Sequence, residues 1–241
     1  MSQLSIIRHA QASLMKADYD QLSDLGHLQA KKLAAYLVEQ DIHFDKIYWG
    51  TLKRHRQTAS YIQNAYDRQS WSYESKELAA FNEHQSPKVA RWILERVLSD
   101  ETSEQLDYYR SLLPEADLNF PKKQYLALFD LVSVAWAKGA IDASPIGIAP
   151  FSVFRRGVEK GIQSVVDASK RKEHIAIITS GGPTSVSVGK ALQLSDEKTM
   201  ELNGIIRNSA ITNFLFNENR FSLHQFNTTP HLQTSDLLTY V

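Results

Sequence analysis

The sequence contains no cysteine. This absence excludes disulfide bonds, a thiol nucleophile and metal sites built on thiolates. Its 8 histidines are scattered and form neither an H-x-x-x-H nor an H-E-x-x-H pair, so zinc is not indicated either. We therefore expect neither a metal site nor a cofactor.

The chain also lacks an excess of charge of either sign. Its 27 Lys and Arg residues are balanced by 27 Asp and Glu residues. Without an overall basic field, we expect neither nucleic acid nor an anionic membrane as a partner. The basic cluster at residues 53–56 has to be judged as a local site.

Long hydrophobic runs are absent as well. No stretch approaches the roughly 18 consecutive apolar residues that a membrane span needs. The opening residues, M-S-Q-L-S-I-I-R-H, lack the basic region and long apolar run of a signal peptide. We therefore expect a cytoplasmic protein without membrane contact.

Alternating strand and helix patterns predict the fold class. Short apolar runs ending in polar residues are typical of buried strands, and stripes at helical spacing separate them. Two β-rich runs near the end of the chain predict a hairpin. This order predicts a three-layer α/β/α sandwich with a mostly parallel sheet. The predicted strands are residues 4–7, 47–49, 175–178, 209–216 and 221–226. The first predicted helix follows Ser23 and carries its apolar stripe at residues 30–38, and the other predicted helices are residues 52–66, 151–168 and 184–192.

Residues 86–150 have a different character. Ser86 is predicted to cap a helix that Pro87 opens, and Tyr125 to Trp136 reads as a more hydrophobic helix. We predict one domain over residues 1–241 in which residues 86–150 are a helical insertion, with a cap over the pocket as one role for it. The oligomeric state stays open, a homodimer included.

Polar or glycine-rich residues follow three predicted strands. They are Arg8-His9, Gly50-Thr51 and the T-S-G-G run at residues 179–182. Ligands of open parallel sheets bind beyond the carboxyl ends of the strands. Converging there, these residues would provide a histidine, arginines and backbone amides at a helix start, which suits a phosphate. A nucleotide loop is disfavoured, because the G-x-G-x-x-G and Walker A spacings are missing.

Four segments resemble the motifs of the histidine phosphatase superfamily, also called the phosphoglycerate mutase-like family. Residues 6–12, I-I-R-H-A-Q-A, resemble its opening R-H-G signature. Residues 22–30 match L-T/S-x-x-G-x-x-Q-A, and residues 50–59 resemble S-x-L-x-R-A-x-Q-T-A. The fourth is residues 175–182. The resemblance covers the core and not the insertion.

The resemblance implies covalent catalysis. His9 would attack phosphorus and form a phosphohistidine, while Arg8 and Arg54 would hold the phosphate oxygens and disfavour protonation of His9. Glu83 falls where the family carries its proton donor, in a loop after the family's third strand, and would protonate the leaving oxygen. Water would then complete hydrolysis. The expected partner is a small phosphorylated substrate, or a phosphate or sulfate anion.

The late motif departs from the family pattern V-x-S-H-G-G, because Ser180 stands where the family carries a second histidine. With Gly181, Ser180 is expected to line the phosphate pocket. A serine donates a hydrogen bond but brings no positive charge, and losing one such donor typically costs about 10²–10³-fold in rate. We interpret Ser180 as the trait of a branch of the superfamily. His84 is a candidate replacement for the histidine, and Arg56 is expected to be an exposed neighbour of Arg54.

The favoured function is therefore hydrolysis of phosphomonoesters by a histidine-type acid phosphatase, active or slowed. The alternative is a weakened or inactive member that binds phosphorylated ligands. A phosphoglycerate mutase is less favoured, because the surroundings of Glu83 do not reproduce the mutase N-E-R-H-Y-G loop. The sequence does not identify the substrate.

Overall fold

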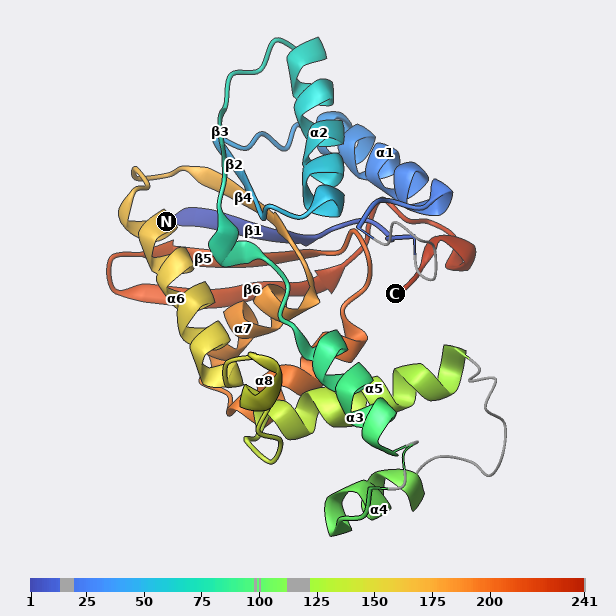
Figure 1. Cartoon of the computed structure of the whole chain (residues 1–241). Coiled ribbons are helices and arrows are strands. Elements are labelled where there is room, and N and C mark those ends of the chain that lie inside the picture. The colour runs from blue at the N-terminus through green and yellow to red at the C-terminus, as the bar shows by residue number, and fades with distance from the viewer. Residues whose placement is uncertain (14–19, 98, 100, 112–121, 241) are drawn as a thin grey trace.

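A six-stranded sheet lies at the centre of the molecule, with helices on both faces (Figure 1). The computed structural model describes residues 1–13, 20–97, 99, 101–111 and 122–240. The strand order is β3-β2-β4-β1-β5-β6, and β5 alone runs in the direction opposite to the other five strands. The strands are β1 (Ser2–Arg8), β2 (Lys46–Trp49), β3 (Glu74–Glu77), β4 (His174–Thr179), β5 (Ile211–Asn217) and β6 (Arg220–Thr228). The predicted mostly parallel α/β sandwich is confirmed.

Most of the helices fall into three groups. α1 and α2 cover one face of the sheet, whereas α6 and α7 cover the other (Figure 1). α3, α4 and α5 form a further helical layer beside the sheet (Figure 1). The helices are α1 (Asp24–Glu39), α2 (Lys53–Arg68), α3 (Ser86–Val97), α4 (Glu104–Ser111), α5 (Lys122–Ala137), α6 (Phe151–Asp167), α7 (Gly181–Leu192) and α8 (Asp196–Glu201).

Successive residues of the central strands supply two different cores. Ile6 and Ile177 pack on the side of α6 and α7, whereas Ile7 and Ile178 pack on the side of α1 and α2. All four are at most 1% exposed. Because side chains alternate across a strand and both faces are covered, these strands are continuous apolar runs in the sequence. Each buried isoleucine contributes about 1.5–3 kcal/mol relative to an exposed one.

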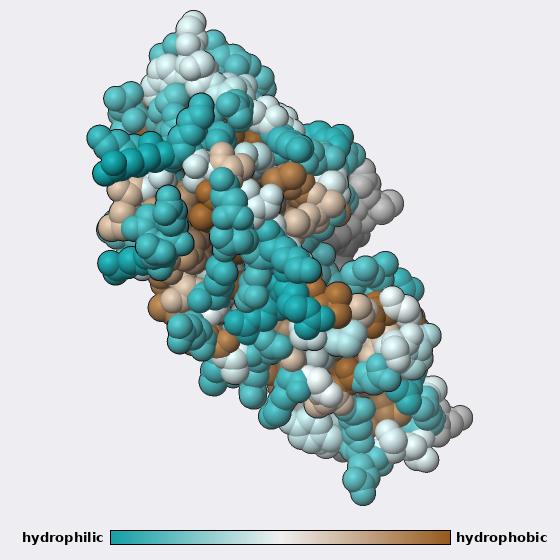
Figure 2. Space-filling view, turned by 90° about the vertical axis from the view of Figure 1, so that its left-hand side faces the viewer, coloured by the Kyte–Doolittle hydropathy of each residue, from teal (hydrophilic) through white to brown (hydrophobic). Residues whose placement is uncertain are grey.

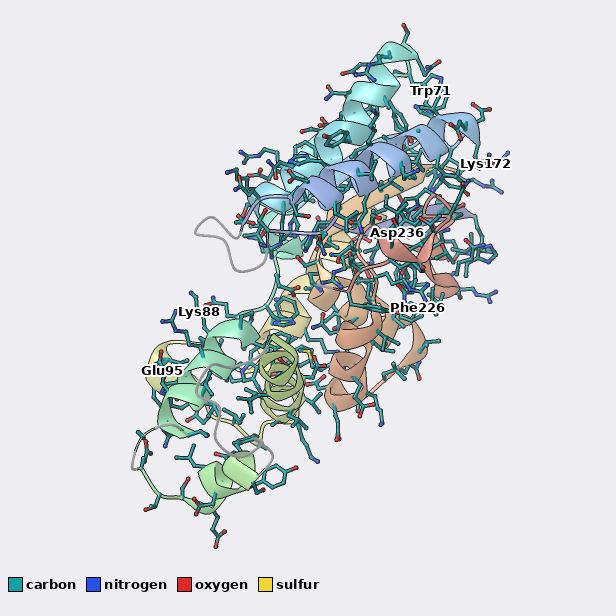
Figure 3. All side chains as sticks on the ribbon, turned by 90° about the vertical axis from the view of Figure 1, so that its right-hand side faces the viewer. Trp71, Lys88, Glu95, Lys172, Phe226 and Asp236 are labelled. Carbon is teal, nitrogen blue, oxygen red and sulfur yellow. The ribbon has the colours of Figure 1, made fainter. Side chains whose placement is uncertain are left out.

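The described part of residues 86–150 shares the core under α6 and α7. Ile93 of α3, Leu106 of α4 and Val132 of α5 are buried in the same cluster as the sheet residue Phe214. α3, which carries Lys88 and Glu95, lies at the opposite end of the molecule from Trp71 (Figure 3). Two of the prolines in the predicted insertion, Pro114 and Pro121, lie outside the described residues.

Several elements differ from the sequence-based prediction. Ser86 is the first residue of α3 rather than its cap. α7 begins at Gly181 and not near residue 184, because Ser180 is extended (φ −111°, ψ −178°) and takes the N-cap position. Strand β3 and the short helices α4 and α8 were not predicted, since they are polar and carry no clear apolar period.

The predicted hairpin near the C-terminus is confirmed as β5 and β6. Its turn is at Glu218 and Asn219. The ring of Phe214 stacks on that of Phe221, with 4.7 Å between the ring centroids. On the face in Figure 2, apolar side chains form separate patches between hydrophilic ones. Among the described helices, none is long and apolar enough to cross a membrane.

Gly26 fixes the contact between α1 and the loop that follows β1. Its backbone N–H donates to the N-cap Ser23 Oγ at 3.0 Å, and a Cβ on it would lie 2.0 Å from the carbonyl oxygen of Gln11. We expect Gly26→Ala to lower the free energy of unfolding by about 2 kcal/mol or more, because backbone has to move. Urea denaturation measures this loss.

The matched control is Gly157→Ala in α6. A Cβ on Gly157 meets no atom within 4 Å. Alanine removes the entropic cost of a helical glycine, so this variant should be more stable by about 0.5–1 kcal/mol. Equal unfolding midpoints for the two variants would contradict the close approach at Gly26.

Candidate active site

His9 directly follows β1 and is 4% exposed. β1 and β4 end together, with Arg8 opposite Thr179, and the backbone N–H of His9 donates to the Thr179 carbonyl at 2.7 Å. On the ring, Nδ1 lies 2.7 Å from the carbonyl oxygen of Ala10. Since a carbonyl only accepts, Nδ1 carries the proton and Nε2 presents its lone pair.

Burial and nearby positive charge keep His9 neutral. Burial lowers its pKa well below 6.5, and Arg54, His55 and Arg8 lower it further, in that order, while the Ala10 carbonyl opposes the shift. The sequence suggested the cations as the cause. In the structure the largest cause is burial, because water is excluded from the ring.

Arg54 lies in the first turn of α2 and joins several parts of the site. Its Nε donates to His9 Nε2 at 3.1 Å, and its Nη2 lies 3.5 Å from Ser180 Oγ. On its far side, Nη1 forms an ion pair with Asp20 Oδ1 at 2.7 Å. Arg54 is 6% exposed, so these contacts are made with little competition from water.

Ser180 and its neighbour Gly181 lie where β4 passes into α7. Ser180 Oγ is 2.6 Å from His55 Nε2, and both side chains are fully buried. The ring of His55 lies 5.5 Å from that of His9 between centroids. Burial, followed by Arg54, lowers the pKa of His55 well below 6.5, so this ring is neutral too.

Glu83 reaches the first turn of the same helix. Its Oε1 accepts from the backbone N–H of Gly182 at 3.1 Å and from that of His84 at 2.9 Å. A Cβ on Gly182 would lie 2.3 Å from Glu83 Oε1, so only glycine allows this approach. The carboxylate therefore occupies the positive end of α7, next to the Ser180-Gly181 turn.

His84 packs behind Glu83 and not against Ser180. Its Nδ1 accepts from the Ser86 N–H at 3.2 Å, so Nε2 carries the proton, and Nε2 is 3.4 Å from Glu83 Oε1. The ring packs edge-on against Phe154 at 5.6 Å. Burial lowers the pKa of His84, and Glu83 opposes that shift. The histidine that contacts Ser180 is instead His55.

Arg8 and Arg56 occupy different environments. Arg8 is partly buried, donates from Nη1 to the carbonyl oxygen of Ile206, and is near enough to lower the pKa of His9. Arg56 is exposed and pairs with Glu77 at 2.7 Å, as expected for a neighbour outside the site. The structure thus brings His9, Arg54 and Ser180 into direct contact, with Arg8 and Glu83 around them.

Two residues of this cluster were not singled out from the sequence. Asp20 precedes α2 by more than 30 positions, and no motif indicates that it pairs with Arg54. His55 is visible within the basic cluster at residues 53–56, but its role depends on a contact with a residue 125 positions away. Among the described residues, no group of three or more His, Cys, Asp or Glu side chains could hold a metal ion.

Comparison with known proteins agrees with this fold. Residues 4–85 match the model of the histidine phosphatase superfamily (branch 1). No curated protein matches the chain. The family match spans β1 to Glu83 and so includes His9 and Arg54.

Solved structures resemble the chain over nearly its whole length. A mutant phosphoserine phosphatase from Entamoeba histolytica bound to phosphoserine has a TM-score of 0.58 and 19% identity, covering 96% of this chain and 100% of that one. Phosphoglycerate mutase from Bacillus anthracis has a TM-score of 0.60 and 14% identity, and the match covers 95% of this chain and 94% of that one. The alpha-ribazole phosphatase from Shigella flexneri has a TM-score of 0.59 and 19% identity, and the match covers 94% of this chain and 96% of that one.

The solved structures define the fold class of the protein. The fold is that of the phosphoglycerate mutase-like α/β proteins, and it extends over the chain. The resemblance to the histidine phosphatase superfamily that the sequence predicts agrees with the family model, which matches residues 4–85.

The buried, neutral state of His9 has a measurable consequence. Its folded-state pKa lies well below 6.5, so below about pH 6.5 the unfolded chain binds a proton that the folded chain does not. We expect the free energy of unfolding to fall as the pH decreases from 7 to 5, with His55 and His84 adding in the same direction. Each unit of pKa lowering contributes up to about 1.4 kcal/mol.

Nitrogen-15 NMR of the histidine rings tests the same state directly. His9 should remain the neutral Nδ1–H tautomer from pH 8 down to pH 6. A midpoint near 6.5 for His9 would show that the ring is not shielded as described.

Proposed function

We propose that the protein is a phosphomonoester hydrolase in which His9 becomes transiently phosphorylated. The observation that carries this proposal is a buried, neutral imidazole whose Nε2 lone pair faces the guanidinium of Arg54 at 3.1 Å. A nucleophile and a phosphate-binding cation are thereby in contact at the end of a parallel strand. The phosphatases among the similar structures support the assignment.

Nucleophilic attack begins from His9 Nε2. Because the Ala10 carbonyl holds the Nδ1 proton at 2.7 Å, the ring keeps one tautomer and one orientation. As the Nε2–P bond forms, positive charge develops on the ring, and the Ala10 carbonyl stabilises it through Nδ1–H. The phosphorus–oxygen bond to the leaving group breaks in the same step.

Arg54 exchanges partners when the substrate binds. Its Nε–H, which occupies the His9 lone pair in the free protein, turns to a phosphate oxygen and frees Nε2 for attack. The incoming dianion also competes with Asp20 for the same guanidinium. Arg8 and the Ser180-Gly181 turn add donors, so that the charge of the transferred phosphoryl group is spread over several contacts.

Glu83 supplies the proton for the leaving oxygen in this mechanism. Its carboxyl group is only partly buried and sits at the start of α7, beside the turn that carries Ser180. In the second half-reaction the same carboxylate takes a proton from water, which attacks phosphorus and releases His9 and inorganic phosphate. The substrate is a small phosphorylated metabolite or phosphorylated side chain.

A weakened member that only binds phosphorylated ligands is the second candidate. The neutral Ser180, in place of a histidine, favours it, because one charged donor is missing. It predicts binding of phosphate esters without turnover. A mutase is less favoured, because phosphohistidine would have to persist against water.

His9→Ala tests the covalent mechanism. We expect turnover of p-nitrophenyl phosphate to fall at least about 10³-fold, since the nucleophile is lost while the arginines remain. Wild-type protein quenched in alkali after exposure to labelled substrate should carry an acid-labile phosphoryl group that His9→Ala lacks. The control is His224→Ala on the exposed face of β6.

Unchanged turnover in His9→Ala, with no labelled protein, would rule out the proposal. Ligand binding without turnover over a broad panel of phosphate esters would favour the binding protein.

Glu83→Gln tests the proton donor. A glutamine keeps the shape and loses the proton, so kcat/KM for an alkyl phosphate such as glycerol phosphate should fall by about 10²–10⁴-fold. For p-nitrophenyl phosphate, whose leaving group needs little protonation, the loss should be much smaller. The control Glu77→Gln removes an exposed carboxylate that pairs with Arg56. Equal losses for both substrates would assign the donor to another group.

A further inference from the structure

His55 is the titratable side chain nearest to His9 that the mechanism above does not use. It lies in the first turn of α2, is fully buried, and its ring centroid is 5.5 Å from that of His9. An exposed helix residue would need no explanation. A polar ring buried beside the nucleophile does, since an apolar side chain would be cheaper to bury.

The contacts of His55 connect it to Ser180 and not to solvent. Nε2 is 2.6 Å from Ser180 Oγ, a short hydrogen bond. On the other side of the ring, Nδ1 faces the backbone of Gly50, which opposes the lowering of the His55 pKa but offers Nδ1 no hydrogen bond of good geometry. A Cβ on Gly50 would lie 2.4 Å from Nδ1. A buried N–H without a partner costs more than a buried lone pair, so the proton belongs on Nε2.

This tautomer leaves the hydroxyl hydrogen of Ser180 unused. A serine oxygen has two lone pairs and one hydrogen. The lone pairs accept from His55 Nε2–H at 2.6 Å and from Arg54 Nη2–H at 3.5 Å. The O–H bond must therefore point to a third group. Arg54 contacts both Ser180, through Nη2, and His9 Nε2, through Nε, so the Ser180 hydroxyl lies near the nitrogen that would carry the phosphoryl group.

We propose that His55 and Ser180 form a neutral hydrogen-bonding pair that aims the Ser180 O–H at the phosphoryl group on His9. This inference rests on the proposed phosphatase function. Ser180 touches the transferred group, and His55 is a positioning residue that acts through it. No bond is made or broken in the pair, and it contributes one oriented donor where charge develops.

The pair also links two departures from the family motifs. In the motif patterns, alanine stands at the position of His55 and histidine at that of Ser180. These positions are 125 residues apart in the chain and in direct contact in the fold. Relative to the motif patterns, the imidazole is on His55 instead of at position 180, and the small side chain is at position 180 instead of at position 55. The hydrogen bond between the two residues keeps an imidazole near the site, but on α2 instead of at the end of β4.

Kinetics of single and double variants test the pair. We expect Ser180→Ala and His55→Ala each to lower kcat for p-nitrophenyl phosphate by about 10²-fold with little change in KM, because the donor acts on the transition state. The double variant should be no slower than either single one, since both remove the same donor. His55→Gln keeps an N–H group and should recover activity to within about tenfold of wild type.

Binding of orthovanadate, which resembles the transferred phosphoryl group, gives a readout independent of turnover. The single variants should bind it about 10²-fold more weakly than wild type, while affinity for inorganic phosphate changes less. The control is His174→Ala, which breaks a similar pair, Ser5 Oγ to His174 Nε2 at 2.8 Å, at the beginning of β4. Its kcat and vanadate affinity should equal those of wild type.

The outcomes separate the two proposals. If wild type hydrolyses substrate through His9 but both single variants keep wild-type kcat and vanadate affinity, the proposed role of the His55–Ser180 pair is refuted. The proposed phosphatase function is then unaffected. Additive losses in the double variant, or a His55 ring found by NMR as the Nδ1–H tautomer, would also overturn it. If no variant turns over, weaker vanadate binding in Ser180→Ala and His55→Ala still supports the pair, and unchanged binding or none at all refutes it.

Discussion

The contact between the Arg54 guanidinium and His9 is the interaction on which the site depends. It holds the first turn of α2 against the end of β1, and its 3.1 Å bond defines which ring nitrogen of His9 carries the lone pair. The same guanidinium reaches Ser180 at the N-cap of α7 and Asp20 in the loop before α1. Three segments from distant parts of the chain are thereby brought around one imidazole. Because the group is nearly buried, these contacts act at low effective dielectric and keep their strength.

The parallel register of β1 and β4 makes this contact geometrically possible. Arg8 lies opposite Thr179, so His9 and Ser180 leave the sheet at the same level. β2 pairs with the other side of β4 and delivers α2 to the same edge. Glu83 then closes the arrangement by binding the amide of Gly182. A shift of β1 by one residue would exchange the faces of Ile6 and Ile7 and carry His9 away from the level of Ser180, so the register of the sheet also fixes the site.

Much of this arrangement could be predicted from the sequence. Apolar runs that stop at Arg8-His9 and at Thr179 indicate strand ends, and strand ends of a parallel sheet converge. Strand β3 could not be predicted, because its E-S-K-E sequence is defined only by backbone pairing with β2. The roles of Asp20 and His55 could not be predicted either, since each depends on a tertiary contact between distant segments. Burial, the largest cause of the lowered His9 pKa, is likewise a property of the folded chain.

The hydrogen bonds of His9 also determine which other species can reach its ring. Nδ1–H is held by the Ala10 carbonyl, and the Nε2 lone pair is held by the Arg54 Nε–H. A transition-metal cation would have to displace a guanidinium and then remain beside its positive charge. An anion meets no such barrier, because it pairs with the Arg54 guanidinium and thereby releases the lone pair of His9 Nε2. The resting ring is therefore shielded from transition-metal cations, whereas an anion that binds Arg54 would uncover Nε2.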